Sequence, residues 1–146
     1  MRGQSHAQGQ AGRGLTKPDY EILAGFRQAL RGFTTFSEGA ARESGLAPQQ
    51  HQALLAIKGA PGRDVLCIGE IAEALAVKPH TAVELVNRLV AADLVRRSPD
   101  PLDRRKMLVS LTPRAEALLA ELVVAHVREL QAIRPALLRL LERFPD

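Results

Sequence analysis

Residues 68–113 read IGEIAEALAVKPHTAVELVNRLVAADLVRRSPDPLDRRKMLVSLTP, and this stretch decides the fold. Apolar residues recur every three or four positions on both sides of a break at residues 77–79, which indicates two helices. Pro79 suits the first turn of the second helix, because an N–H at that position would have no partner. Two short helices joined by so tight a turn are typical of a helix-turn-helix.

A β-hairpin is predicted directly after the second helix. The segments LVRRS and KMLVSLT have the short alternating pattern of strands, and the proline-rich loop PDPLDRR joins them. Thr112 and Pro113 then supply a favourable N-cap and first residue for a further helix. A hairpin that protrudes beside the second helix of a helix-turn-helix is a wing.

Helical patterns flank this unit on both sides. One spans residues 17–45, although its signal weakens from Gly39 onward, and another spans residues 113–146, where Pro135 should break or kink it. A further helix begins near Pro48, and VLCI after it has the pattern of a small buried strand. The predicted fold is therefore mainly α: a winged helix-turn-helix at about 48–112 between long terminal helices.

The length of 146 residues suggests one domain, over residues 17–146. Residues 1–16 are rich in Gly, Gln, Ser and Arg and are expected to form a disordered tail. Cys67 is the single cysteine, which excludes an internal disulfide and favours a reducing compartment, so we expect a cytoplasmic protein. No signal peptide and no membrane-spanning segment is expected.

Positive charge is concentrated in the middle of the chain. The formal net charge is +4, and residues 78–114 hold eight Lys and Arg against four Asp and Glu. A basic centre favours a polyanionic partner, although a solvated surface would also account for it. Aromatic residues are scarce, with four Phe, one Tyr and no Trp, which disfavours proteins that stack single-stranded bases.

The second helix of the helix-turn-helix carries a polar face. His80, Glu84 and Arg88 recur at intervals of four, Thr81 lies beside His80, and Lys78 precedes the helix. Residues near the start of a recognition helix reach base edges in the major groove, where a glutamate accepts a hydrogen bond from cytosine. The alternative is a solvated face with a Glu84–Arg88 ion pair.

The far end of the hairpin carries a cluster of cations. Arg104, Arg105 and Lys106 follow Asp103 directly. An arginine at the tip of a wing can enter the narrow, electronegative minor groove. An ordinary polar loop with an Asp103–Arg105 ion pair is the alternative, and both interpretations can hold together.

At this point the sequence resembles the MarR family of winged-helix transcriptional regulators. DPLDRRKMLVSLTP matches the family's Asp-x-x-Asp-x-Arg wing, and residues 68–97 align without gaps to its two helices, within a likeness that covers about Tyr20 to Leu141. The resemblance implies a homodimer, with its terminal helices intertwined, that binds double-stranded DNA. It also implies that the protein is a repressor and that binding of a small lipophilic or phenolic effector releases it from DNA.

The resemblance assigns roles to individual residues. Lys78, His80 and Thr81 fall where family members meet DNA, and Arg105 falls on the arginine that enters the minor groove. Arg104 and Lys106 would then support phosphate contacts. The sequence departs from the family at His80, Val83 and Glu84, where small hydroxylated or basic residues are usual, so the family's typical operator is not implied.

An effector site and a redox role both have alternative interpretations. His51 and His126 are expected where the terminal helices meet the DNA-binding unit, either in an effector pocket or as satisfied core histidines. Cys67 lies in an apolar run and is interpreted as a small hydrophobe rather than a peroxide sensor, since reactivity needs exposure and a lowered pKa.

Nothing in the sequence indicates catalysis. It has no Gly-rich phosphate loop, no zinc-ligand spacing and no nucleophile elbow, so we expect no enzyme, cofactor or metal. The leading hypothesis is a dimeric, ligand-responsive DNA-binding regulator. The alternative is a winged-helix module that mediates protein association without reading DNA, and the acidic Glu84 is its best support.

Overall fold

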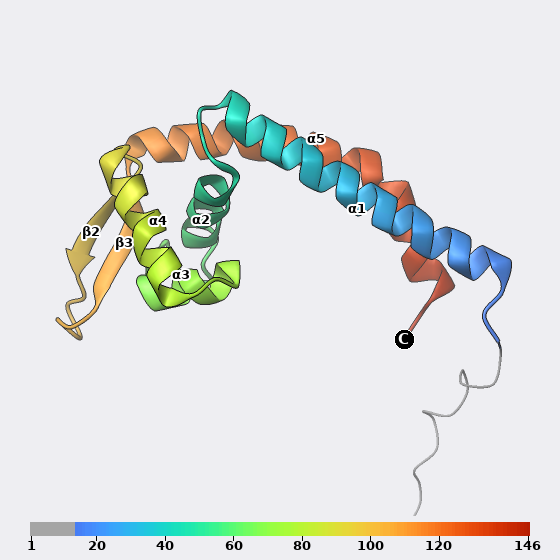
Figure 1. The fold of residues 1–146 in the computed structure, drawn as a ribbon, viewed down its shortest axis with the longest axis horizontal. Helices are drawn as coiled ribbons and strands as arrows, with labels where there is room; N and C mark the ends of the chain where they lie inside the picture. Colours follow the sequence, from blue (N-terminus) through green and yellow to red (C-terminus); the bar gives the residue numbers. More distant parts are fainter. Residues whose placement is uncertain (1–13) are drawn as a thin grey trace, which may run out of the picture.

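The computed structural model describes residues 14–146, which form a long helical arm and a smaller head (Figure 1). The arm is the pair α1 (Lys17–Glu43) and α5 (Pro113–Arg143), and the head comprises the elements between them. A disordered tail was expected at residues 1–16, and residues 1–13 of it lie outside the described part of the chain. The predicted fold class, mainly helical with a winged helix-turn-helix between long terminal helices, is confirmed.

Helix α1 continues through the region where its sequence signal weakens. It ends at Glu43, and Gly45 then adopts φ +81, a left-handed conformation that favours glycine. The Leu46 amide donates to the Ala41 carbonyl at 2.9 Å and so closes the helix end. Ala41 is fully buried at this point, so packing against the head supports a segment with weak intrinsic periodicity.

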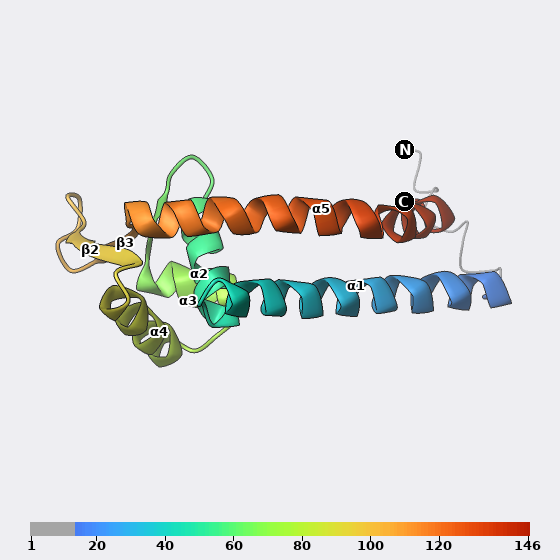
Figure 2. The same ribbon diagram turned by 90° about the horizontal axis from the view of Figure 1, so that it is seen from above.

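Helix α5 runs beside α1 along most of the arm, as both views show (Figure 2). Thr112 is its N-cap and accepts a hydrogen bond from the Ala115 amide at 3.2 Å. The sequence predicted a break or a kink at Pro135, and the break does not occur, because the helix continues to Arg143. The last turns of α5, in deepest red, change direction in Figure 1, so the helix is bent along its length. Pro135 is exposed, so water can reach the carbonyl whose helical donor is missing.

The head contains three helices and a small sheet. Its elements are α2 (Pro48–Lys58), β1 (Val65–Cys67), α3 (Ile68–Leu75), α4 (Pro79–Ala91), β2 (Val95–Pro99) and β3 (Met107–Leu111). The sheet is antiparallel with strand order β1-β3-β2, so the predicted VLCI strand pairs with the hairpin. The hairpin register places Arg97 opposite Val109.

One hydrophobic core holds α4 against the rest of the head. Its largest fully buried side chains come from α2, α3, α4 and the hairpin, and include Leu54, Ile57, Ile71, Val86, Leu89, Leu94 and Val109. Leu119 and Leu122 of α5 join the same cluster. The arm and the head therefore share packing, and a change at their junction can reach the helix-turn-helix.

A polar contact joins the start of α1 to the end of α5, at the end of the arm away from the head (Figure 1). Arg143 donates from Nε to Asp19 Oδ1 at 2.5 Å and from Nη2 to Thr16 Oγ1 at 3.1 Å. Asp19 also accepts from the Thr16 amide at 2.7 Å, which caps α1. The hydrogen bonds from Arg143 and then from Thr16 lower the pKa of Asp19 to about 2.

Replacing Arg143 by glutamine is expected to lower the melting temperature at pH 7. The pKa of Asp19 is lower in the folded state than its ordinary value of 3.8, so the contact stabilises the fold above pH 4. That stabilisation is lost as the pH falls toward 2. Thermal unfolding of both proteins from pH 7 to pH 2 should therefore show curves that converge in acid. Arg134→Gln, at an exposed site of α5, is the matched control. A difference in melting temperature between Arg143→Gln and the parent that stayed the same at every pH would contradict the role given to the Asp19 carboxylate.

Candidate nucleic-acid interface

Helix α4 is buried along one face and open along the other. Ala82, Leu85, Val86 and Leu89 are buried against the head. The opposite face presents the predicted reading residues: Lys78, His80, Glu84 and Arg88 are exposed and Thr81 is half-buried. Lys78 is the N-cap of α4, so its side chain stands where a helix attracts anions.

The predicted alternative for this face, a Glu84–Arg88 ion pair, is not formed. Among the ion pairs of residues 14–146, none within 4.0 Å includes Glu84 or Arg88. Asn87, one turn after Glu84, instead accepts a hydrogen bond from the Arg97 guanidinium of β2. This link between α4 and the hairpin was missed by the sequence analysis, which placed Arg97 on a strand without a partner.

The hairpin loop is ordered by its two aspartates. Asp103 accepts from the Arg105 amide and from Arg105 Nε, both at 3.1 Å, and Asp100 accepts from the Leu102 amide at 2.8 Å. The Asp100 amide donates to the Lys106 carbonyl at 3.0 Å and closes the loop. Hydrogen bonds from Arg105 lower the pKa of Asp103, so it stays ionised and holds the turn.

The basic side chains of the hairpin are free to meet a partner. Arg104, Arg105 and Lys106 are exposed, and 91% of the Arg105 side chain remains accessible despite its ion pair with Asp103. Arg96 and Arg97 on β2 are exposed as well. Figure 1 shows the hairpin and α4 together at the end of the head that lies away from the arm. This arrangement brings the two predicted groups of DNA-binding residues to one end of the protein.

His51 and His126 meet where the arm joins the head. Their ring centroids are 4.8 Å apart, and they line a cavity of about 240 Å³ together with residues of α1 and α2, among them Phe33, Ser37, Glu38, Pro48 and Leu55. Phe33 and Phe36 contact His126 edge to face. The structure therefore brings together the two histidines that were predicted for this junction.

The two histidines differ in their hydrogen bonding. His126 Nδ1 donates to the Leu122 carbonyl at 2.6 Å, which leaves Nε2 to accept from Ser37 Oγ at 2.7 Å. His51 is 4% exposed, and its Nδ1 has no hydrogen-bond partner within the described residues. Burial, and then the nearby His126, lower the pKa of His51. Both ring nitrogens of His126 therefore have partners, whereas Nδ1 of His51 has none among the described residues.

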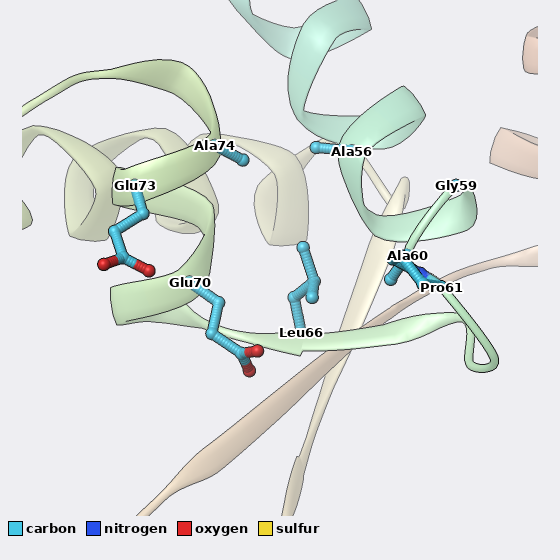
Figure 3. Close-up of a pocket in the computed structure, with 8 residues that line it drawn as sticks. All are labelled: Ala56, Gly59, Ala60, Pro61, Leu66, Glu70, Glu73 and Ala74. Carbon is cyan, nitrogen blue, oxygen red and sulfur yellow. The ribbon is translucent and has the colours of Figure 1, made fainter. Parts of the chain in front are cut away.

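A second cavity, of about 410 Å³, opens between α2, β1 and α3 (Figure 3). Its floor is apolar, and Glu70 and Glu73 of α3 stand at one side of it. Glu70 is engaged by the Arg63 guanidinium and by the Cys67 amide, which holds its pKa at about 2. Cys67 thus serves as the N-cap residue of α3 and is half-buried. An acidic surface of this kind is unsuited to DNA.

Within residues 14–146 there is no group of three His, Cys, Asp or Glu side chains that could hold a metal ion. The same part of the chain contains no helix long and apolar enough to span a bilayer.

Comparison with known proteins identifies this arrangement. Residues 44–106, which span the helix-turn-helix and the loop of the hairpin, match the family model described as MarR family. The matched part of the chain is that of a MarR family protein. The fold of the chain matches that of AbsC, a MarR family transcriptional regulator from Streptomyces coelicolor, with a TM-score of 0.65 at 22% identity over 82% of this chain and 80% of AbsC.

Two further proteins resemble the chain in sequence. The HTH-type transcriptional repressor NicR of Pseudomonas putida is 46% identical over 54 residues, which are 37% of this chain and 34% of NicR. The chain thus matches about a third of that relative. BpsR of Bordetella bronchiseptica, whose DNA binding is regulated by 6-hydroxynicotinic acid, is 28% identical with a TM-score of 0.60 over 86% of this chain and 99% of BpsR. The matched family and the matched fold are those of transcription regulators and not of enzymes.

Proposed function

We propose that the chain is a homodimeric repressor that reads double-stranded DNA. The head, at about 48–112, places α4 in the major groove and the hairpin in the minor groove. One observation carries this proposal: the exposed face of α4 and the exposed cations of the wing lie at the same end of the head (Figure 1). Phosphate contacts by such cations supply affinity, and side chains of the helix supply base recognition.

The arm supports dimerisation by a second copy of the chain. Apolar side chains remain exposed along both arm helices: Tyr20, Leu23 and Leu30 on α1, and Val123, Val124, Val127, Leu130, Leu138 and Leu141 on α5. A set of this size is more than a monomer usually leaves in water. A symmetric dimer would set two α4 helices about 34 Å apart, one turn of DNA.

Selection of bound sequences from random duplexes tests this function. We expect the full chain to enrich a pseudo-palindrome whose half-sites lie about one helical turn apart. Failure to enrich any sequence, with the protein folded, would favour the alternative of a winged-helix module that associates with proteins and does not read DNA.

The cavity at the arm–head junction is proposed as the effector site. His51 lines this cavity, and its buried Nδ1 has no hydrogen-bond partner within the described residues, so a ligand that reached this atom would gain a hydrogen bond. A volume near 240 Å³ suits a small aromatic molecule of the phenolic kind. The regulation of BpsR by 6-hydroxynicotinic acid makes a hydroxylated aromatic acid the best candidate.

Adding 6-hydroxynicotinic acid is expected to release the selected duplex, and His51→Leu should weaken that response. Loss of a hydrogen bond to a charged ligand costs about 1.5–3 kcal/mol. The variant should therefore need at least about 10-fold more ligand than the parent for half-maximal release of the DNA. Fluorescence anisotropy of labelled DNA measures release, and the neutral amide of the same ring is the ligand control. A His51→Leu protein that responds like the parent, or a parent that does not respond, would contradict this effector proposal.

A further inference from the structure

Glu84 is an isolated negative charge in the middle of a cationic surface. It is exposed on the open face of α4, and no Lys, Arg or His nitrogen of the described residues lies within 4.0 Å of its carboxylate. Arg88 is four residues later, in the orientation that favours an ion pair on a helix, yet the pair is not formed. Beside DNA phosphates, such a carboxylate weakens binding unless a hydrogen-bond donor compensates it.

The edges of the bases limit what that donor can be. Guanine and thymine present acceptors in the major groove, and a carboxylate, which only accepts, is repelled by them. Adenine presents its N6 amino donor next to the N7 acceptor, so one carboxylate oxygen would face a lone pair. Cytosine presents the N4 amino donor with only a C–H beside it, and is therefore the base that best fits a carboxylate.

The neighbours of Glu84 complement the other half of the same base pair. The Asn87 oxygen accepts a hydrogen bond from Arg97 and is held on the side of the hairpin, while the two N–H groups of the Asn87 side chain remain available as donors. Arg88 likewise only donates. Asn87 and Arg88 lie three and four residues after Glu84, so the three share one face of α4. One acceptor followed by donors matches a cytosine amino group beside the O6 and N7 acceptors of its paired guanine.

We propose that Glu84 selects a cytosine at a fixed position in each half-site of the operator. Asn87 and Arg88 face the acceptors on the guanine side of that pair. This inference rests on the proposed DNA-binding function and specifies one base that the function leaves open.

Parallel selections with the parent chain, Glu84→Gln and Glu73→Gln test the proposal. Glu73 is exposed on α3 beside the second cavity, so its substitution removes the same charge away from the reading face (Figure 3). We expect the parent and Glu73→Gln to enrich cytosine at the same position of both half-sites. Glu84→Gln should lose that preference and favour adenine, because a glutamine side chain matches the donor and acceptor of adenine.

Binding titrations on the selected duplex measure how much the cytosine contributes to affinity. Changing the cytosine to thymine in one half-site should weaken binding of the parent by about 5- to 20-fold, the lower part of the range for one base contact, and binding of Glu84→Gln by less than about 2-fold. A parent operator without a required cytosine, or one whose cytosine survives Glu84→Gln, would overturn the proposal. If the parent enriches no sequence, the proposed function fails and this inference fails with it.

Discussion

Replacing Arg104 and Arg105 together by alanine is expected to weaken binding of the selected duplex at least about 100-fold. Each arginine in a protein–DNA contact is worth about 1–3 kcal/mol, and a dimer loses two from each wing. The variant removes the bond from the Arg105 side chain to Asp103, but the Arg105 amide still donates to Asp103, and Asp100 and the Asp100–Lys106 backbone bond still close the loop, so the hairpin should remain folded. The loss should therefore come from missing contacts with DNA.

The salt dependence of binding distinguishes this loss from a general weakening. Each phosphate contact contributes about 0.9 to the slope of log Kobs against log salt concentration, so the loss of the Arg104 contact from both wings should reduce the slope by about 2. Arg128→Ala/Arg134→Ala removes the same charge from exposed sites on α5 and is the matched control. An unchanged affinity and slope in the wing variant would show that the hairpin is not a DNA element.

Placing aspartates at Val127 and Leu130 is expected to convert the dimer to a monomer. Both side chains are more than 40% exposed in the single chain, and the proposed second copy would cover them. Covering the exposed part of each such side chain contributes about half of the 1.5–3 kcal/mol for full burial, and the dimer holds four of them. A buried charge adds a further cost, so the dimer dissociation constant should rise more than about 100-fold. Sedimentation velocity at micromolar concentration measures the change.

The effect on DNA binding should follow the loss of the dimer. A monomer engages one half-site, so its affinity for the full operator should fall to its affinity for a half-site duplex. Leu102→Asp is the control for sedimentation alone, because Leu102 is 96% exposed on the hairpin loop, outside the arm, and its substitution should leave the dimer intact. A parent chain that sediments as a monomer, or a double variant that remains dimeric, would contradict the proposed arm interface.

The elements that could be predicted from the sequence are those with local signals. The break at residues 77–79, the Thr112-Pro113 cap and the alternation of the second strand each depend on neighbouring residues, and the helix-turn-helix and hairpin were predicted from them. Pro135 carries an equally local signal, but α5, which packs against α1, continues through it to Arg143. The local preference of proline did not decide the structure there.

The contacts that could not be predicted join residues far apart in the chain. Ser37 bonds to His126 across 89 positions and Arg143 to Asp19 across 124, and neither spacing leaves a pattern in the sequence. The Asn87–Arg97 bond depends on how the hairpin packs against α4. The unsatisfied Nδ1 of His51 is of the same kind, since only the packed junction shows which of the two histidines has a partner.

Direct comparison of specific and non-specific binding tests the central claim, which is that the chain reads DNA sequence through α4 and the wing. The parent chain should be titrated at one salt concentration against the selected duplex and against a scrambled duplex of the same composition. The account predicts an affinity ratio of about 10³ or more, as for sequence-specific regulators. A ratio near one would contradict it.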